Sequence, residues 1–458
     1  MKTGWNALAA AVCALMGLAA APARAADVPD DIEALLRQAA EDDKRMATGK
    51  APPPPGARGG LRGFAQFEVA RTIDRPTHWS KAISRIELEN SGRLAPNLRW
   101  KLGARADYDA VFEVTDHYPG AVKRDQRFNL FLRENYLDVG AGDWEFRLGR
   151  QHVIWGEMVG LFFADVVSAR DMREFILPEF NLLRIPQWAV RAEYFKGDFH
   201  GELLWIPFPT YDESGKPGAA FFPAQPVYPG YAVRYRDEDR PARKPANGNY
   251  GLRAGWLKNG WDVSGFYYRS TDAAPTFYRE VGPGPVVSYQ ARHDRISQLG
   301  GTLAKDLGVF VLKTEAVYTR GRGLTVLRLD DADGLARQNT LDWALGLNFA
   351  LPAETRLNLQ LFQSRIANAR DADLLQDKNE SGYSILLHGK LAPRWEAEVL
   401  WVASLNRNDW MLRPKVHWGF EQNWRLVVGV DVFHGPALGY FGRYDAQDRV
   451  YTELRYSF

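Results

Sequence analysis

The chain has 458 residues, of which 46% are hydrophobic, and a formal net charge of +2 at pH 7. This near-neutral charge gives no electrostatic basis for binding nucleic acid, and the length exceeds what one soluble core usually holds, although no interior boundary divides the chain. After the N-terminus no apolar run reaches the ~18 residues of a transmembrane helix. A β-barrel, whose backbone groups pair between strands, is the remaining way to span a membrane.

Residues 1–25 form a predicted secretory signal peptide. Met1 and Lys2 precede an apolar stretch that ends at Ala21, and the Ala-Arg-Ala sequence at 23–25 is typical of a cleavage site. The only cysteine, Cys13, lies inside this segment. The mature chain is therefore expected to reach an oxidising compartment without disulfides and to be stable by other means.

Residues 26–60 are expected to form a periplasmic N-terminal helix and a Pro/Gly-rich linker. Asp30 and Asp31 suit the cap of a short helix with one apolar stripe. Pro52 to Pro55 then make a stiff spacer, and glycines up to Gly60 loosen the approach to the next segment. Two interpretations remain open: a partly ordered leader, or an arm that docks a periplasmic partner or enters a pore.

From Leu61 onward, apolar and polar residues alternate in segment after segment. In 98–112 nearly every second residue is apolar or aromatic, and charged residues such as Arg99 and Lys101 stand between them. A strand sends successive side chains to opposite faces, so each segment has one apolar and one polar face. The pattern predicts an all-β, antiparallel transmembrane barrel over 61–458 with about eighteen strands. Sixteen is the alternative, because 128–139 and 292–303 alternate poorly.

The connections between these segments are of two kinds, tight turns and long polar loops. The tight turns are 140–143, 196–198, 258–260, 305–307, 392–394 and 421–423, and the long connections are 115–126, 207–247, 271–290, 321–339, 366–379 and 435–447. Many tryptophans sit beside the tight turns: Trp100, Trp144, Trp256, Trp261, Trp395, Trp418 and Trp424. This arrangement predicts short periplasmic turns with an aromatic girdle, and long extracellular loops.

One long connection, residues 156–186, breaks the pattern. Its stretch 166–176 is closer to helical than to strand spacing, and the whole segment is too apolar to extend freely into water. We expect it to fold into the barrel and narrow the pore, with an apolar cap or a subunit contact as the alternative. The expected pore-lining and constriction residues are Arg105, Asp107, Arg147, Arg150, Glu157, Arg170, Asp171, Arg173, Glu174 and Arg191.

A family resemblance appears at the start of this segment. Leu148-Gly149-Arg150-Gln151, then Trp155-Gly156-Glu157, then Asp165 and Pro178 resemble an uncharacterised proteobacterial outer-membrane β-barrel family known as a domain of unknown function. The resemblance covers the chain from about the first strand to Phe458. It implies a barrel in the outer membrane and supplies no substrate or catalytic residues.

These features predict a porin-like channel in the outer membrane of a Gram-negative bacterium that passes small polar solutes by diffusion. Pore radius and lining charge would set the selectivity, and the arginines of the constriction slightly favour anionic or carboxylated solutes. The expected partners are outer-membrane lipids, the solutes and the barrel assembly machinery. That machinery reads C-terminal strands like the one that ends in Phe458.

Three alternatives compete with a channel. An aromatic-rich loop at 207–247 would suit a plugged barrel that moves apolar molecules or lipids, and the N-terminal arm would suit the partner barrel of an envelope export system. A hydrolase is disfavoured, because the adjacent pairs Asp116-His117 and His293-Asp294 point to opposite faces if they lie on strands. No catalytic residue, metal site or cofactor is predicted.

Overall fold

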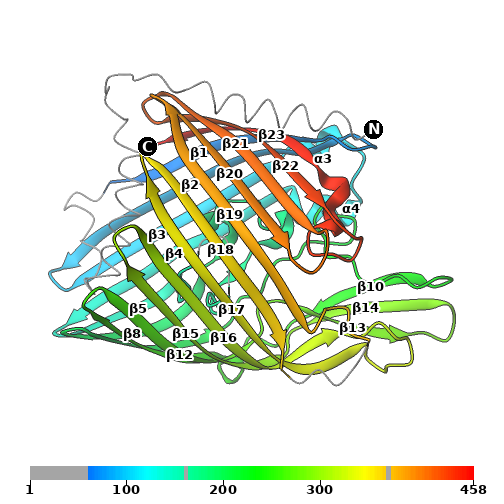
Figure 1. Cartoon of the computed structure of the whole chain (residues 1–458), viewed down its shortest axis with the longest axis horizontal. Helices are drawn as coiled ribbons and strands as arrows, with labels where there is room; N and C mark the ends of the chain where they lie inside the picture. Colours follow the sequence, from blue (N-terminus) through cyan, green and yellow to red (C-terminus); the bar gives the residue numbers. More distant parts are fainter. Residues whose placement is uncertain (1–59, 159–162, 368–372) are drawn as a thin grey trace.

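A computed structural model describes residues 60–158, 163–367 and 373–458, and the expected signal peptide and the arm up to residue 59 lie outside these ranges. Eighteen strands form one sheet (Figure 1). They are β1 (Arg62–Thr72), β2 (Trp79–Ala95), β3 (Leu98–Asp109), β4 (Phe128–Ala141), β5 (Trp144–Gln151), β8 (Gln187–Lys196), β9 (Phe199–Phe208), β11 (Asn249–Lys258), β12 (Trp261–Thr271), β15 (Arg295–Asp306), β16 (Phe310–Thr325), β17 (Leu335–Leu351), β18 (Thr355–Ile366), β19 (Asn379–Ala392), β20 (Trp395–Ser404), β21 (Trp410–Glu421), β22 (Trp424–His434) and β23 (Arg449–Ser457).

The sheet closes on itself. Each of these strands pairs antiparallel with the next, and β1 pairs with β23 from Phe64↔Ser457 to Thr72↔Arg449. At the seam Gly63 and Phe458 exchange backbone hydrogen bonds of 2.8 and 2.9 Å. A closed barrel leaves no strand edge unpaired. The predicted antiparallel barrel is confirmed with eighteen strands, because both weakly alternating segments form strands, β4 and β15.

The two faces of the barrel wall are inverted relative to a soluble protein. On β1 the Phe67 side chain points outward and is 47% exposed, whereas its neighbour Glu68 points inward and is 7% exposed. The same outward exposure recurs around the wall at Ile86, Leu88, Leu130, Leu132, Leu203, Leu252, Leu299 and Leu361. The apolar side chains therefore cover the outside of the cylinder, and many charged ones line its lumen.

The two ends of the barrel differ as the loop lengths predict. At the short-turn end, exposed tryptophans gather, and the rings of Trp395 and Trp418 stack at 5.2 Å. The tight β11–β12 turn has positive φ at Asn259 (53°) and Gly260 (73°), which only residues of this kind adopt without strain. At the long-loop end, toward the right of Figure 1, lie α3 (Val111–Val114), α4 (Gly120–Gln126), η2 (Pro245–Asn247) and η3 (Gly442–Gln447).

Two of the long loops join into a second sheet at that end. β10 (Ala232–Asp239) lies in the β9–β11 connection, and β13 (Thr276–Val281) and β14 (Val286–Arg292) lie in the β12–β15 connection. β10 pairs with β14 in parallel and β14 pairs with β13 antiparallel, beyond the end of the barrel in Figure 1. Local sequence patterns do not predict this sheet, because its strands come from loops that are separate along the chain.

The connection between β5 and β8, residues 152–186, is called the inner loop here. It contains β6 (Ala169–Arg170), the 3-10 helix η1 (Met172–Glu174), the short helix α5 (Phe180–Leu183) and β7 (Arg184–Ile185), and β6 pairs with β7. The helical spacing expected at 166–176 is realised only as the single turn of η1. The loop contacts inward-facing side chains of strands as distant as β16 and β21, so the prediction that it enters the lumen is confirmed.

Among the described residues, no helix is both long enough and apolar enough to cross a membrane.

Candidate functional site

The first half of the inner loop packs in a dry core against one side of the barrel. Trp155 is fully buried, with its ring 5.2 Å from that of Phe266 and 5.6 Å from that of Tyr268. The indole Nε1 donates to Glu202 Oε1 at 3.1 Å. A Cβ on Gly251 would lie 2.6 Å from the Trp155 ring, so the close approach requires glycine there. We call the inward residues of this side the apolar wall: Ala189, Leu204, Ile206, Phe266, Tyr268 and Val317.

A single carboxylate fixes the backbone of this first half. Glu315, on β16 and nearly fully buried, accepts hydrogen bonds from the backbone N–H groups of Met158 (2.7 Å), Ala164 (3.1 Å) and Glu157. Three convergent amide dipoles supply the positive field that a buried carboxylate needs. Glu315 therefore folds the loop back on itself at this point of the lumen.

The second half of the loop lies against the opposite side. β12 and β23 are nine strands apart in either direction around the ring of eighteen, which places them across the lumen from each other. Phe175 and Leu177 pack into an apolar cluster with Met411 and Phe433. We call the inward cations of this side the cationic wall: Lys81, Arg85, Arg413, Lys415, Arg425, Arg449 and Arg455.

The cationic wall binds the loop through carboxylates and carbonyls. Lys81 Nζ lies 2.6 Å from Glu174 Oε2 and 2.7 Å from Glu68 Oε2. Arg413 Nη2 donates to the carbonyl of Leu177 at 2.8 Å. Glu179 pairs with two further arginines of the wall. This half of the loop thus combines apolar packing with several ion pairs to the wall, whereas the first half is held mainly by packing and by hydrogen bonds to the buried carboxylates Glu202 and Glu315.

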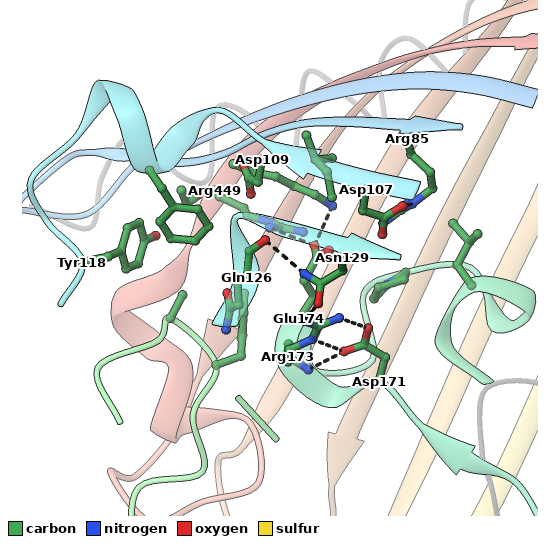
Figure 2. Close-up of a pocket in the computed structure, with 18 of the residues that line it drawn as sticks. Arg85, Asp107, Asp109, Tyr118, Gln126, Asn129, Asp171, Arg173, Glu174 and Arg449 are labelled. Atoms are coloured by element: carbon green, nitrogen blue, oxygen red, sulfur yellow. Dashed lines mark hydrogen bonds and ion pairs between the residues drawn. The ribbon is translucent and has the colours of Figure 1, made fainter. Parts of the chain in front are cut away.

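Two cavities lie on either side of this second half. The long-loop cavity reaches from Lys81 and Arg85 toward Tyr118 and Gln126 of the outer loops. Figure 2 shows Arg173 of the inner loop held between Asp171, at 2.6 Å, and Asn129 of β4, at 3.1 Å. The cavity is lined by five cations and four carboxylates beside apolar side chains such as Phe112 and Phe221, so the charges of its lining are nearly balanced.

The short-turn cavity lies toward the other end of the barrel. Its lining includes Lys415, His417 and Glu453. The residues that line both cavities are Lys81, Arg85, Glu174, Pro178, Leu182 and Arg449. Residues 174–182 and the wall beside them therefore separate the two cavities.

Half of the pore-lining residues predicted from the sequence meet in the long-loop cavity: Arg105, Asp107, Asp171, Arg173 and Glu174. Arg105 donates to the carbonyl of Leu182 at 3.3 Å and so reaches the inner loop. Asp107 instead accepts two bonds from Arg85, at 3.0 and 3.2 Å. These side chains surround the narrow region, and their role in a pore stays a prediction.

The other predicted residues lie elsewhere. Arg147 pairs with Asp138 at 2.6 Å, Arg191 pairs with Glu193 at 2.8 Å, and Glu157 lies 4.0 Å from Arg253. The amide of Arg170 donates to Asp212 of the β9–β11 loop at 2.8 Å. These residues hold the wall and the loops together outside the two cavities.

Arg150 does not join the lumen charges. It lies on the same face of β5 as Leu148, whose side chain is exposed on the outside of the barrel, and its cross-strand partner is Trp188. Its Nε donates to the carbonyl of Leu132 at 2.8 Å. The alternation of β5 accounts for this position, because Arg150 is an odd number of residues from the inward-facing Arg147.

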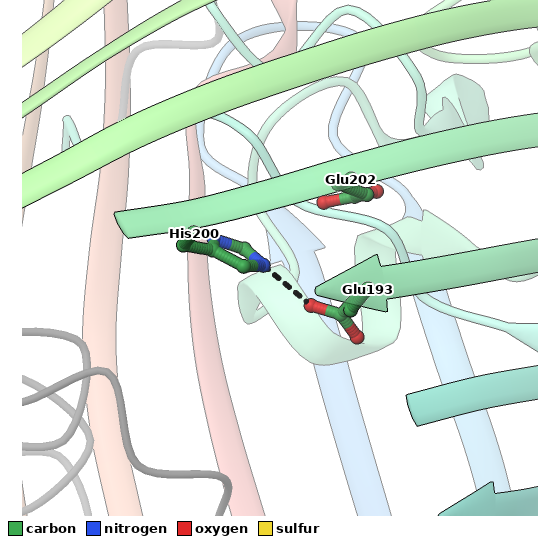
Figure 3. Close-up of side chains that lie close together, drawn as sticks. All are labelled: Glu193, His200 and Glu202. Atoms are coloured by element: carbon green, nitrogen blue, oxygen red, sulfur yellow. Dashed lines mark hydrogen bonds and ion pairs between the residues drawn. The ribbon is translucent and has the colours of Figure 1, made fainter. Parts of the chain in front are cut away.

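Glu193, His200 and Glu202 come together near a short turn (Figure 3). Their ligand atoms lie within 4.8 Å of one another, a spacing that suits a metal ion, although no metal site was predicted. Arg191 already contacts both carboxylates, at 2.8 Å from Glu193 and 3.0 Å from Glu202. The cluster therefore already holds a cation, and we interpret it as an ion-pair network.

In the two pairs considered for catalysis, Asp116-His117 and His293-Asp294, the aspartate does not orient the histidine beside it. His117 stacks on His78 with ring centroids 3.6 Å apart, while Asp116 faces Lys123 at 3.7 Å. His293 lies between Glu238, at 2.8 Å from Nε2, and the carbonyl of Asp272, at 2.9 Å from Nδ1. These contacts join outer loops to one another.

One titratable group lies where the outer loops meet the inner loop. Asp212, buried in the β9–β11 connection, accepts the 2.8 Å bond from the Arg170 amide. Burial raises the pKa of this carboxyl to about 6, against a smaller opposing effect of Arg170. The contact between the two loops is thus linked to pH.

Lys81, Glu179, Arg449 and Arg455 were not among the predicted site residues. A signal for the two arginines existed, because the C-terminal strand alternates and places Arg449 and Arg455 on the face opposite Val450. Glu179 lies 276 residues from Arg455. Local pattern reading does not connect residues that far apart.

The fold and the occupied lumen define the class: a closed, eighteen-stranded, porin-like β-barrel that carries a loop inside. The chain belongs to the family described as "Protein of unknown function (DUF1302)", whose model matches residues 6–458, and the resemblance seen in the sequence is confirmed. A comparison with curated protein sequences finds no match.

Solved structures share the fold at low sequence identity. OccAB4 of Acinetobacter baumannii is 10% identical with a TM-score of 0.51, over 89% of this chain and 100% of that one. OccAB2 of the same organism is 11% identical with a TM-score of 0.51, over 88% and 98%. OccK8 (OprE) of Pseudomonas aeruginosa is 10% identical with a TM-score of 0.50, over 87% and 97%.

Proposed function

We propose that the protein is a porin-like channel that lets small polar solutes, anionic ones preferentially, diffuse across the outer membrane of a Gram-negative bacterium. The observation that carries this proposal is the pair of charged cavities on either side of residues 174–182. Both cavities are polar, and a thin segment of loop and wall divides them. A solute can pass from one cavity to the other if residues 174–182 move aside or leave room for it.

The outer surface supports the location. Leucine and isoleucine side chains cover the outside of the strands, and tryptophans gather at the short-turn end. A bilayer solvates an apolar band and holds tryptophan at its interface. The short turns would then face the periplasm and the long loops the exterior.

The charge of the lining supports the preference for anions. In the short-turn cavity six cations, Lys81, Arg85, Arg413, Lys415, Arg425 and Arg449, face the carboxylates Glu68, Glu174, Glu179 and Glu453. Carboxylates outside the lining, Asp107, Asp431 and Glu398, pair with four of these cations and balance much of their charge. The preference for anions therefore rests on the cations that stand at the surface of the cavity, where they raise the local concentration of anions. The same polar lining makes transport of apolar molecules the weaker candidate.

Conductance of the mature protein in planar lipid bilayers tests the proposal. An ohmic current that grows with salt is expected, and deletion of Val166 to Phe180 should enlarge it, since that stretch helps to occlude the lumen. Point substitutions at the partition provide a second test if the deletion fails to fold. Silence from protein that circular dichroism shows to be folded would overturn the channel.

The same preparation separates the alternatives. Co-purified lipid, together with the absence of any current in bilayers, would indicate a plugged barrel for apolar molecules. Lipid or peptide hydrolysis that disappears in His117→Ala would indicate an enzyme. We propose no catalytic step, because the stacking of His117 on His78 and the pairing of Asp116 with Lys123 already account for both members of that pair.

A further inference from the structure

Arg425 and Arg455 place two like charges directly opposite each other. They are cross-strand partners in the register of β22 and β23 and both point into the lumen. Like charges in this position destabilise a sheet unless an anion lies between them. The wall thus has a cation pair that requires a negative partner.

Glu179 of the inner loop supplies that partner. Its Oε1 lies 2.9 Å from Arg425 Nη2, and its Oε2 lies 3.0 Å from Arg455 Nη1. One carboxylate therefore bridges two guanidinium groups with one oxygen to each. Arg425 has a second carboxylate, Glu453, at 3.1 Å. Within residues 60–158, 163–367 and 373–458, the only carboxylate within 4.0 Å of Arg455 is Glu179.

The bridge is built so that its carboxylate is the accessible member. The Glu179 side chain is 38% exposed, compared with 25% for Arg425 and 14% for Arg455. The short-turn cavity adjoins it, and Arg413, Lys415 and His417 line that space as well. Glu179 and Arg425 line this cavity and Arg455 does not, so a small organic acid in it meets Arg425 first and reaches Arg455 by taking the place of Glu179.

A neighbouring pair shows the contrasting, permanent arrangement. Asp431 bridges Arg413 and Arg449 at 2.8 Å each, and its side chain is fully buried. A carboxylate of the wall itself holds those two arginines, although both of them also line the short-turn cavity. Arg455, by comparison, depends on a carboxylate that belongs to the loop.

The backbone fold of the loop around α5 does not depend on the Glu179 side chain. Glu179 precedes α5, yet its side chain makes no capping hydrogen bond. Its backbone carbonyl accepts the amides of Leu182 and Leu183, at 2.9 Å each, and these bonds do not involve the carboxylate. Displacing Glu179 therefore exchanges one carboxylate for another at the two arginines.

We propose that Arg425 and Arg455 form a carboxylate-binding subsite that Glu179 fills from within the chain and that a solute carboxylate takes over in transit. This inference rests on the proposed channel for its biological role, but the subsite exists whether or not current flows. Guanidinium pairs recognise the planar, two-oxygen geometry of a carboxylate. The solute class is thus small organic acids with at least one carboxylate. Exchange with Glu179 also loosens the segment that divides the cavities.

The decisive experiment removes the Glu179 carboxylate from the subsite and then supplies a carboxylate from solution. In Glu179→Ala, purified in detergent, the thermal midpoint should fall and then rise again with added acetate, in a saturable way. Acetamide, and chloride at equal ionic strength, should have no such effect, because neither supplies a carboxylate. Wild-type protein should not respond at the same acetate concentrations, since its own glutamate occupies the subsite.

Two control variants define the result. Glu179→Ala combined with Arg455→Gln should lose the response to acetate, and Glu113→Ala, which removes an exposed partner of Arg127, should never gain one. Rescue by inorganic phosphate but not by acetate would overturn the carboxylate assignment. If Glu179→Ala does not fold, hydrogen exchange at 176–184 of the wild type replaces it. High acetate should speed that exchange relative to acetamide, and equal rates would overturn the proposal.

The outcomes keep the two proposals apart. Acetate rescue in a protein that stays silent in bilayers would retain the subsite and refute the channel. If the wild type conducts but acetate does not raise the thermal midpoint of Glu179→Ala, the channel is retained and the subsite is refuted. In a conducting wild type, succinate should interrupt the single-channel current more than succinamide does.

Discussion

The two halves of the inner loop are held to opposite sides of the barrel by different forces. The first half buries Trp155 in the apolar wall and closes three of its amides on Glu315. The second half also buries Phe175 and Leu177, but it adds carboxylates and carbonyls that meet the cationic wall at the surface of two cavities. The first contact is dry and the second is partly wet.

This difference assigns separate tasks to the two halves. Apolar packing and a buried carboxylate are insensitive to dissolved ions, so the first half works as a fixed anchor. Ion pairs beside water exchange partners at small net cost, so the second half is where a solute can interact with the loop. Changes on the apolar wall should therefore alter stability, and changes on the cationic wall should alter permeation.

The largest effect is expected at the anchor. Trp155→Ala should lower the free energy of unfolding by about 3–5 kcal/mol, because it leaves a large void in a closely packed core. Urea unfolding of the detergent-solubilised protein measures the loss. Trp155→Phe, which keeps most of the apolar contact and loses only the bond to Glu202, should cost less. Equal losses for the two variants would show that the core is not what holds the loop.

Glu315→Gln should have the next largest effect. The amide keeps one acceptor oxygen and turns an N–H₂ group toward the backbone amides, so about 1–3 kcal/mol of local stability is lost. Hydrogen exchange at Glu157, Met158 and Ala164 should accelerate, while exchange at 176–184 changes little. Matching acceleration in both halves would contradict their independence.

Much of this architecture could be predicted from local patterns. Alternation within each strand identified the barrel, and the apolar content of 156–186 placed that segment inside. Alternation also assigns Arg150 to the outer face with Leu148. The prediction that Arg150 lines the pore was wrong because it grouped this residue with the loop instead of following the alternation of its strand. The pattern is reliable because one buried and one exposed face impose the same period on every strand.

The contacts across the lumen could not be predicted in this way. The Lys81–Glu174 pair spans 93 residues, and the Glu157–Glu315 contact spans 158. Such pairings depend on the path of a loop that has no repeating pattern of its own. The sheet of β10, β14 and β13 escaped prediction for the same reason, since it joins strands from two separate loops.

On the wet side, Glu174→Gln should cost only about 1 kcal/mol, the value of one partly exposed hydrogen-bonded group. Lys81 keeps Glu68 as a partner at 2.7 Å, so the buried ammonium group of Lys81 still has a carboxylate to pair with. The gain of net positive charge at the partition should move the reversal potential in a salt gradient toward anion selectivity. Glu113→Ala, on an exposed outer loop, serves as the control with the same change in charge. A shift of equal size in both variants would place the selectivity outside the lumen.

The last effect concerns pH and is local to the contact between the inner and outer loops. The pKa of Asp212 is raised to about 6 by burial, so the folded protein binds a proton more tightly than the unfolded chain does. The resulting stabilisation is complete below the ordinary value of about 3.8 and is lost as the pH rises through about 6. After correction for intrinsic rates, hydrogen exchange at 170–172 and 212–213 should be slower at pH 4 than at pH 8. Asp212→Asn keeps the acceptor for the Arg170 amide and removes the titration, so its corrected exchange should not vary over this range. If the corrected exchange rates of Asp212→Asn still vary with pH, another titratable group causes the variation. The attachment of the second half of the inner loop would then not depend on the protonation of Asp212.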